Sequence, residues 1–216
     1  MKNLALTLTF AILFYCQLII AQKSTDSIQL RKEYTNIKDA LKNPEEVYRL
    51  NLSNQNVNIK SDDWIKFTNL EYLNLSNDHL KIIPNEISLL KNLKVLDLSG
   101  NDFSMLPTNL WKLSNLEELY LNNDRNLKLD KNIYVLGKLP KLKELHLEDD
   151  DLKILPSEIK ELKHLESLYL NRNKFENIPL QIRSLEHLQY LDLEGNKIKP
   201  QIMAPENYNF GFKIHF

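Results

Sequence analysis

The chain repeats itself every 23 residues, and this period constrains its fold more than any other feature. Equivalent apolar residues begin successive units, and each unit starts 23 residues after the previous one, except for one step of 26. The seven starting residues are Val47, Leu70, Leu93, Leu116, Leu142, Leu165 and Leu188. Such a period predicts a solenoid, in which each unit packs only on its neighbours and the stack buries one continuous core.

Each unit follows one pattern, which predicts where its side chains point. In the unit "LKVLDLSGNDFSMLPTNLWKLSN", residues 93–115, apolar residues occupy repeat positions 1, 4, 6, 11, 14, 18 and 21. The pair at positions 4 and 6 has the period of a strand, and the pair at positions 18 and 21 has helical spacing. Position 9 holds Asn or a related residue, and position 15 often holds Pro, where the chain leaves the strand.

This pattern resembles the leucine-rich repeat, "LxxLxLxxNxLxxLPxxIxxLxx", in the 23-residue form common in exported bacterial proteins. The resemblance implies an α/β solenoid of about seven repeats that is curved, with a parallel β-sheet on its concave face. We predict that residues 47–200 form this solenoid. Residues 22–46 and 201–216 are then expected to cap its two ends, which would otherwise expose apolar surface.

The two caps have different patterns. Before the first repeat, apolar residues recur at helical spacing and predict a helix over about residues 26–43, which Pro44 ends. The apolar residues of that helix are Leu30, Tyr34, Ile37 and Leu41. After the last repeat, alternate residues are apolar, which predicts a strand that covers the final unit. These residues are Phe210, Phe212, Ile214 and Phe216.

The first 21 residues have the pattern of a secretory signal peptide. Lys2 precedes an uncharged apolar run that ends at the small residue Ala21, and the sequence from Gln22 onward is polar. We predict cleavage before Gln22 and export of the chain, as a secreted, periplasmic or cell-surface protein. The alternative is an uncleaved membrane anchor formed by residues 4–21. Cys16, the only cysteine, lies inside this leader, so the mature chain is expected to have no disulfide.

Position 9 departs from the family pattern. In leucine-rich repeats an inward Asn at this position bonds backbone groups of neighbouring turns, so the resemblance implies a structural ladder. The seven residues are Gln55, Asp78, Asn101, Asp124, Asp150, Asn173 and Asn196. An ionised Asp offers only acceptors, and Asp124 and Asp150 belong to adjacent repeats, about 5 Å apart. They would repel unless one is protonated or a cation lies between them. We expect the longer, 26-residue unit to turn Asp124 into solvent instead.

The outward positions 3 and 5 of the strands form the candidate binding surface, with residues just after the strands at its rim. Tyr120, His146 and Tyr169 occupy position 5 in three consecutive repeats, which predicts an aromatic ladder flanked by carboxylates. Tyr and Arg are enriched where binding energy concentrates, although cross-strand aromatic pairs can also simply stabilise a sheet. The candidate partner-binding residues are Tyr72, Glu118, Tyr120, Glu144, His146, Glu148, Asp149, Tyr169, Arg172 and Tyr190.

The sequence predicts no catalytic site, no metal site and no cofactor. Glu144 and His146 lie two residues apart on one strand, about 6.5 to 7 Å along it, which is a poor reach for a general acid–base pair. The five histidines fall at different repeat positions, so none makes a pair with metal-ligand spacing. The formal net charge of −1, without a basic stripe, argues against nucleic acid as a partner.

These observations favour an exported, monomeric protein-binding module whose concave face binds a protein. No segment of the mature sequence is apolar enough to form an integral membrane domain. Two alternatives remain open: a structural repeat protein of the cell envelope, held by the uncleaved leader, or an intracellular signalling scaffold. The sequence does not identify the partner, because one fold supports many unrelated functions.

Overall fold

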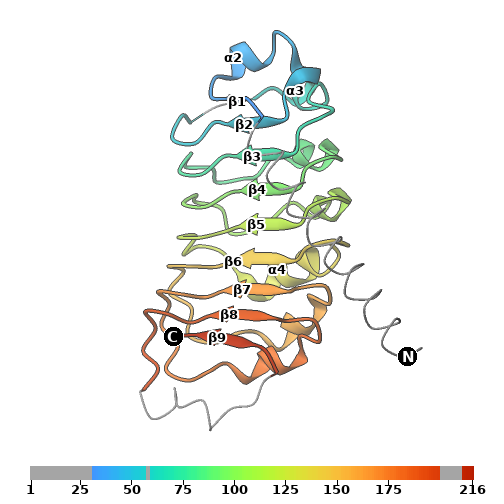
Figure 1. Cartoon of the computed structure of the whole chain (residues 1–216). Coiled ribbons are helices and arrows are strands. Elements are labelled where there is room, and N and C mark those ends of the chain that lie inside the picture. Colours follow the sequence, from blue (N-terminus) through green and yellow to red (C-terminus); the bar gives the residue numbers. More distant parts are fainter. Residues whose placement is uncertain (1–30, 57–58, 200–210) are drawn as a thin grey trace, which may run out of the picture.

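The computed structural model describes residues 31–56, 59–199 and 211–216. The predicted leader, residues 1–21, and residues 22–30 and 201–210 of the predicted caps lie outside these residues. Nine parallel strands form a single sheet in chain order (Figure 1). They are β1 (Glu33–Tyr34), β2 (Arg49–Asn51), β3 (Tyr72–Asn74), β4 (Val95–Asp97), β5 (Glu118–Tyr120), β6 (Glu144–His146), β7 (Ser167–Tyr169), β8 (Tyr190–Asp192) and β9 (Lys213–His215). The predicted repeat solenoid with a parallel sheet is confirmed.

The register of the sheet follows the repeat. Each position-4 leucine of β2 to β8 lies opposite the next, from Leu50 and Leu73 onward. The match continues from Leu119 to Leu145, across the 26-residue unit. These position-4 leucines are fully buried, and so is Leu98 at position 6. The core is therefore one continuous column of leucine side chains, as the period requires.

Short helical segments lie between consecutive strands from β1 to β8. They are α2 (Ile37–Ala40), α3 (Ser61–Trp64) and α4 (Leu129–Leu136), and the 3₁₀ turns η1 (Pro44–Glu46), η2 (Asn85–Leu89), η3 (Leu110–Lys112), η4 (Ser157–Glu161) and η5 (Leu180–Ser184). Pro84, Pro156 and Pro179 directly precede η2, η4 and η5. α4 belongs to the 26-residue unit, so the extra residues lengthen the return segment and leave the sheet undisturbed. No helix in the described ranges is long and apolar enough to cross a bilayer.

A residue with left-handed backbone conformation follows each of the strands β2 to β8, where the chain turns. Position 8 has a positive φ in all seven repeats, between 54 and 195: Asn54, Asn77, Gly100, Asn123, Asp149, Arg172 and Gly195. Gly and Asn adopt this conformation at low cost, and other residues do so less readily. Arg172, at φ +56°, is the least favourable residue in this set.

The N-terminal helix predicted over residues 26–43 is not confirmed. Its described part contains the strand β1, which pairs in parallel with β2, and the four-residue helix α2. A strand satisfies the backbone groups on the open edge of β2, which a helix could not do. Asn36 then starts α2, because its side-chain oxygen accepts a hydrogen bond from the backbone N–H of Lys38. Tyr34 and Ile37 nevertheless pack against the core, as a cap requires.

The strand predicted at the C-terminus is present. β9 pairs with β8, and Ile214 lies opposite Leu191 of the last repeat. Phe212, Ile214 and Phe216 pack against the end of the core. Phe210, the first residue of the predicted alternation, lies outside the described residues.

Candidate functional site

One surface of the sheet carries the side chains at positions 3 and 5 of β2 to β8, and we call it the sheet face. Alternation along a strand places these two positions together, on the side opposite the buried position 4. The outer residues of these strands are partly exposed and the central leucine is buried. β6 is the exception, because His146 is also buried.

A stack of aromatic rings crosses four strands of the sheet face. The ring centroids of Tyr120 and His146 are 3.9 Å apart, with 18° between their planes. Those of His146 and Tyr169 are 4.1 Å apart and nearly parallel, at 4°. Tyr190 continues the row on β8, tilted by 53° at 5.5 Å. The aromatic ladder predicted from position 5 is therefore present, and it extends by one ring at position 3.

His146 is much less exposed than its outward position suggests. The sequence places it on the solvent side of the sheet, yet only 7% of its surface is accessible. The reason is the stacking, since the rings of Tyr120 and Tyr169 cover both faces of the imidazole. An exposed strand position thus becomes buried through its two neighbours on the adjacent strands.

Two glutamates lie beside this stack. The Tyr120 hydroxyl donates a hydrogen bond to Glu118, and Nε2 of His146 lies 3.4 Å from Oε1 of Glu118. Glu144 lies directly opposite Glu118 in the register. The carboxylate that lies against His146 is therefore Glu118, on the neighbouring strand β5. The sequence expectation considered only Glu144, two residues along the same strand, although the diagonal reach from position 3 to position 5 follows from the repeat alignment.

The surroundings shift the pKa values of these groups in different directions. Burial works to raise the pKa of Glu118, but the nearby His146 imidazole and the hydrogen bond from Tyr120 together outweigh burial and hold this pKa below its ordinary value. Burial, followed by the negative charge of Glu118, raises the pKa of Glu144. Burial and the bond to Glu118 also raise the pKa of the Tyr120 hydroxyl. Glu118 is thus the carboxylate of the pair that stays charged most readily.

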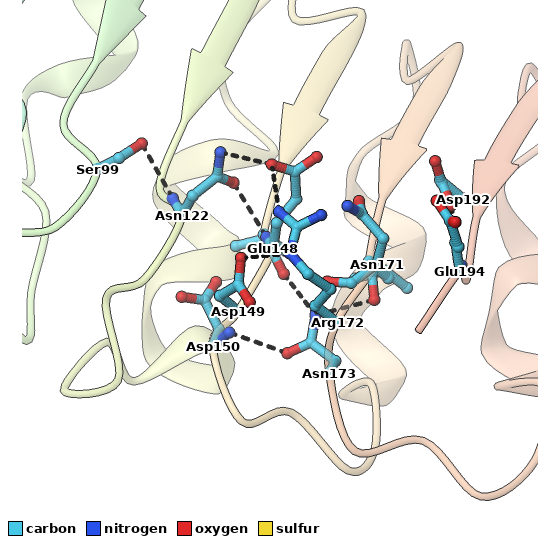
Figure 2. A network of polar contacts seen from close by, with 12 residues as sticks. Ser99, Asn122, Glu148, Asp149, Asp150, Asn171, Arg172, Asn173, Asp192 and Glu194 are labelled. Atoms are coloured by element: carbon cyan, nitrogen blue, oxygen red, sulfur yellow. Dashed lines mark hydrogen bonds and ion pairs between the residues drawn. The ribbon is translucent and has the colours of Figure 1, made fainter. Parts of the chain in front are cut away.

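The rim residues after β6 and β7 form a separate polar network (Figure 2). The Asn122 amide donates to Glu148 at 2.9 Å, and its oxygen accepts from the backbone N–H of Glu148 at 3.0 Å. Arg172 donates to Asp149 at 2.8 Å and lies 3.8 Å from Glu148. The hydrogen bond to Asp149 raises the pKa of Arg172. The predicted rim residues Glu148, Asp149 and Arg172 therefore lie together, and they partly neutralise one another.

Tyr72 does not join the aromatic stack. It lies on β3, where the guanidinium of Arg49 stacks on its ring at 4.0 Å. The strand β4, with Val95 and Asp97, separates Tyr72 from Tyr120. The sheet face therefore has two different halves, a cation–π pair near the N-terminus and an aromatic stack with carboxylates further along.

The position-9 ladder is built as the family pattern implies wherever Asn is present. The Asn101 amide donates to the backbone oxygens of Leu75 and Leu98, at 2.9 and 2.7 Å. Its oxygen accepts from the backbone N–H groups of Asp78 and Leu80. Asn173 makes the equivalent four bonds one repeat after Asp150. Gln55 differs, because it is exposed and donates to the backbone oxygen of Thr35.

The expectation that Asp124 turns into solvent is wrong. Asp124 is 1% exposed, because α4 absorbs the extra length of its repeat and the turn keeps its usual shape. Its Oδ1 accepts from the backbone N–H of Asn101, and Oδ1 of Asp150 accepts from that of Asp124, both at 2.7 Å. Oδ2 of each carboxyl is buried without a hydrogen-bond partner among the described residues. Burial raises the pKa of Asp124 to about 8 and that of Asp150 to about 7.

Comparison with known proteins agrees with this geometry. The leucine-rich repeat family model matches residues 45–103 and 140–198, which is more than half of the chain. The chain belongs to the leucine-rich repeat family. No significant match to a curated protein sequence was found.

Three solved leucine-rich repeat structures illustrate the similarity. A leucine-rich repeat protein of Leptospira interrogans is 28% identical over 77% of this chain and 54% of its own length, with a TM-score of 0.52. Mouse RP105, solved in complex with MD-1, is 27% identical over 74% of this chain and 27% of its own, with a TM-score of 0.56. TLR13, solved in complex with the RNA ssRNA13, is 25% identical over 84% of this chain and 26% of its own, with a TM-score of 0.65. This leucine-rich repeat chain therefore spans about half of the first structure and about a quarter of the others.

Proposed function

We propose that the chain is an exported protein-binding module and that its sheet face contacts the partner. The observation that carries this proposal is the aromatic stack of Tyr120, His146, Tyr169 and Tyr190, which crosses four strands on a partly exposed surface. Exposed aromatic rings in a row remain costly to solvate unless another molecule covers them. Tyr is also among the residue types that dominate binding energy at protein interfaces.

The charges beside the stack indicate the kind of partner. Glu118 retains its negative charge, and Glu144 lies next to it. A protein surface with an apolar centre and one or two basic side chains would complement this arrangement. The TLR13 structure shows that a protein of this fold can be found with RNA. A phosphate backbone would meet carboxylates on this part of the sheet face, so we favour protein over nucleic acid here.

The proposal is tested with one matched pair of tyrosines. Tyr169 lies in the stack, whereas Tyr134 on α4 is 62% exposed and lies outside the sheet face. A partner identified by affinity capture and mass spectrometry is titrated against the wild type, Tyr169→Ala and Tyr134→Ala. We expect Tyr169→Ala to weaken binding by about 2 kcal/mol or more, and Tyr134→Ala to leave it unchanged. A result in which only Tyr134→Ala weakens binding would place the interface elsewhere and sink the proposal.

Charge provides an independent control on the same titration. Lys160, on η4, is exposed and distant from the sheet face in the repeat, so Lys160→Glu should leave the affinity unchanged. Loss of binding in Lys160→Glu together with normal binding of the tyrosine variant would move the interface to the helical side of the solenoid.

The export part of the proposal rests on the sequence of residues 1–21, with its single Lys, its apolar run and Ala21. Expression in a host with a secretory pathway, followed by N-terminal sequencing of the exported chain, tests it. A mature N-terminus at Gln22 is expected. A chain that retains residues 1–21 and fractionates with membranes supports the anchored alternative instead.

A further inference from the structure

Three side chains of the sheet face converge in a way that the proposed function does not use. Glu118 on β5 and Glu144 and His146 on β6 each offer one ligand atom, and these three atoms all lie within 4.8 Å of one another. Carboxylate oxygen and imidazole nitrogen are common ligand atoms for zinc in proteins. The three residues come from two adjacent repeats, so no local sequence spacing reveals the group.

The position of His146 is the second observation that points to a ligand. The imidazole is nine-tenths buried between two tyrosine rings, and its Nε2 has no hydrogen-bond partner within the part of the chain that the structure describes. A buried polar nitrogen without a partner is costly, and such groups are rare in native proteins. The unpartnered nitrogen faces the two carboxylates, which indicates that something belongs between them.

The separation of the ligand atoms fits a small tetrahedral ion. Nε2 of His146 and Oε1 of Glu118 are 3.4 Å apart, which is long for an N–H···O hydrogen bond. Two ligands that each lie about 2.1 Å from a tetrahedrally coordinated zinc ion are about 3.4 Å from each other. Glu144 needs only a small side-chain adjustment to become the third ligand, because its carboxylate is already within reach of the other two.

Neighbouring side chains hold the three candidate ligands in place, as the groups around a metal site do. The hydroxyl of Tyr120 donates to Glu118 and orients its carboxylate, as groups around a metal commonly orient its ligands. The rings of Tyr120 and Tyr169 fix the plane of the imidazole. Glu118 and Glu144 lie opposite each other in the register, so a divalent cation would also relieve their mutual repulsion.

We propose that Glu118, Glu144 and His146 bind one divalent transition-metal ion, with zinc as the ion that fits best. The imidazole ligand disfavours calcium and magnesium, which take oxygen ligands. Three protein ligands leave a fourth position of a tetrahedral ion for water. This inference goes beyond the proposed function and does not depend on it, because zinc binding is measured on the chain alone, without a partner.

The chain contains a natural control for this site. Asp192, Glu194 and His215 also bring three ligand atoms within 4.8 Å of one another, at the C-terminal end of the sheet. There, however, His215 is about half exposed, and its Nδ1 lies 3.2 Å from Asp192. This second group lacks a buried nitrogen without a partner, so we do not assign a metal to it.

The test is calorimetric titration of zinc chloride into the full chain after treatment with a chelator, at neutral pH. We expect one zinc ion per chain, and an affinity that falls by at least about tenfold in Glu144→Gln and in His146→Gln. The control His215→Gln should bind zinc as the wild type does. Glu144→Gln leaves the aromatic stack in place, so it remains informative even if His146→Gln disturbs folding.

Two further measurements complete the test. Zinc should raise the melting temperature of the wild type and of His215→Gln, but not that of Glu144→Gln, because an ion that binds only the folded state stabilises it. Cobalt substituted for zinc should give the intense visible absorption of a tetrahedral site in the wild type. The inference is overturned if the wild type binds no zinc, if Glu144→Gln binds it with unchanged affinity, or if binding is lost only in His215→Gln.

Discussion

The turns with Asn at position 9 and the turns with Asp124 and Asp150 at that position differ in how they pair the buried backbone groups around them. Asn101 and Asn173 each make four hydrogen bonds to buried backbone groups, two as donor and two as acceptor. Asp124 and Asp150 occupy the same place, but each accepts one backbone hydrogen bond through Oδ1 and leaves Oδ2 without a partner in the described structure. Turns that share a left-handed residue at position 8 therefore differ in how completely their polar groups are paired.

The difference shows what the amide of Asn contributes. Its NH₂ group supplies the donors that an ionised carboxylate lacks. A protonated Asp regains one donor, and burial raises the pKa of Asp124 to about 8 and that of Asp150 to about 7. The charged groups that act on the two carboxyls are themselves acidic, and they favour the neutral form further. They are Asp150, Asp97 and Asp102 for Asp124, and Asp149, Glu148 and Asp151 for Asp150. The turns at Asp124 and Asp150 are thus sensitive to pH, and the Asn turns are not.

The largest effect is expected when an Asn turn is broken. Asn173→Ala removes a side chain that pairs the buried backbone groups of Leu147, Asp150 and Leu152, among others. Each buried group left unpaired costs about 1 to 3 kcal/mol, so we expect a loss of about 3 to 5 kcal/mol in the free energy of unfolding. Urea denaturation measures it. The matched control is Asn177→Ala, at an exposed residue of the same repeat, which should change stability by less than about 0.5 kcal/mol.

A second prediction concerns the pH dependence of the Asp turns. The folded pKa values of Asp124 and Asp150 are raised above the ordinary value of 3.8. Their stabilising contribution is therefore fully present below about pH 4 and is lost as the pH rises through about 7 to 8. We expect the free energy of unfolding to fall by several kcal/mol between about pH 5 and about pH 8.

The double variant Asp124→Asn/Asp150→Asn isolates these two carboxyls from the other titrating groups. It should be more stable than the wild type at about pH 8, and its stability should depend much less on pH over the same range. Equal pH profiles for the wild type and the double variant would mean that both aspartates stay ionised in the folded state.

The sequence predicted the parts of the molecule that depend on the repeat period alone. The parallel sheet, its register and the buried leucines all follow from aligning the units, because a solenoid places equivalent residues side by side. The aromatic ladder followed from the same alignment, since Tyr120, His146 and Tyr169 share position 5. These features require no knowledge of how any single side chain is oriented.

The sequence predictions failed where a single contact between particular side chains or strands decides the outcome. Burial of His146 depends on two rings that close over it, and the pairing of Glu118 with His146 depends on diagonal reach between strands. Asp124 was expected in solvent because its repeat is longer, but the extra residues form α4 and the turn is unchanged. The N-terminal cap was predicted from helical spacing, which gives no information on the open edge of β2 that β1 completes.

A third prediction converts an Asn turn into an Asp turn. Asn101→Asp replaces the amide that donates to Leu75 and Leu98 with a carboxyl that can donate only when it is protonated. We expect a loss of about 2 kcal/mol at about pH 8 and a smaller loss at about pH 5. Thermal unfolding at the two pH values gives the comparison. An equal loss at both values would argue that the carboxyl state does not control the turn.

The smallest expected effect concerns the residue just before this ladder. Arg172 adopts a positive φ of 56° at position 8, where Gly100 and Gly195 serve in other repeats. A non-glycine residue in this conformation costs about 1 to 2 kcal/mol. The exposed ion pair of Arg172 with Asp149 returns less than about 1 kcal/mol. Arg172→Gly should therefore raise the free energy of unfolding by up to about 1 kcal/mol, measured by urea denaturation.

Arg125→Gly is the matched control for that change. Arg125 is also exposed and lies 3.9 Å from an aspartate, Asp151, but it is not among the residues with positive φ in the described chain. Glycine at position 125 relieves no backbone strain and increases the conformational entropy of the unfolded chain. The free energy of unfolding should therefore fall by a few tenths of a kcal/mol. Backbone strain is often retained where a side chain has a function, and Arg172 is one of the predicted partner-binding residues. If Arg172→Gly stabilises the fold and also weakens partner binding, the strain at this turn is maintained for binding; if it does neither, Arg172 has no special role on this surface.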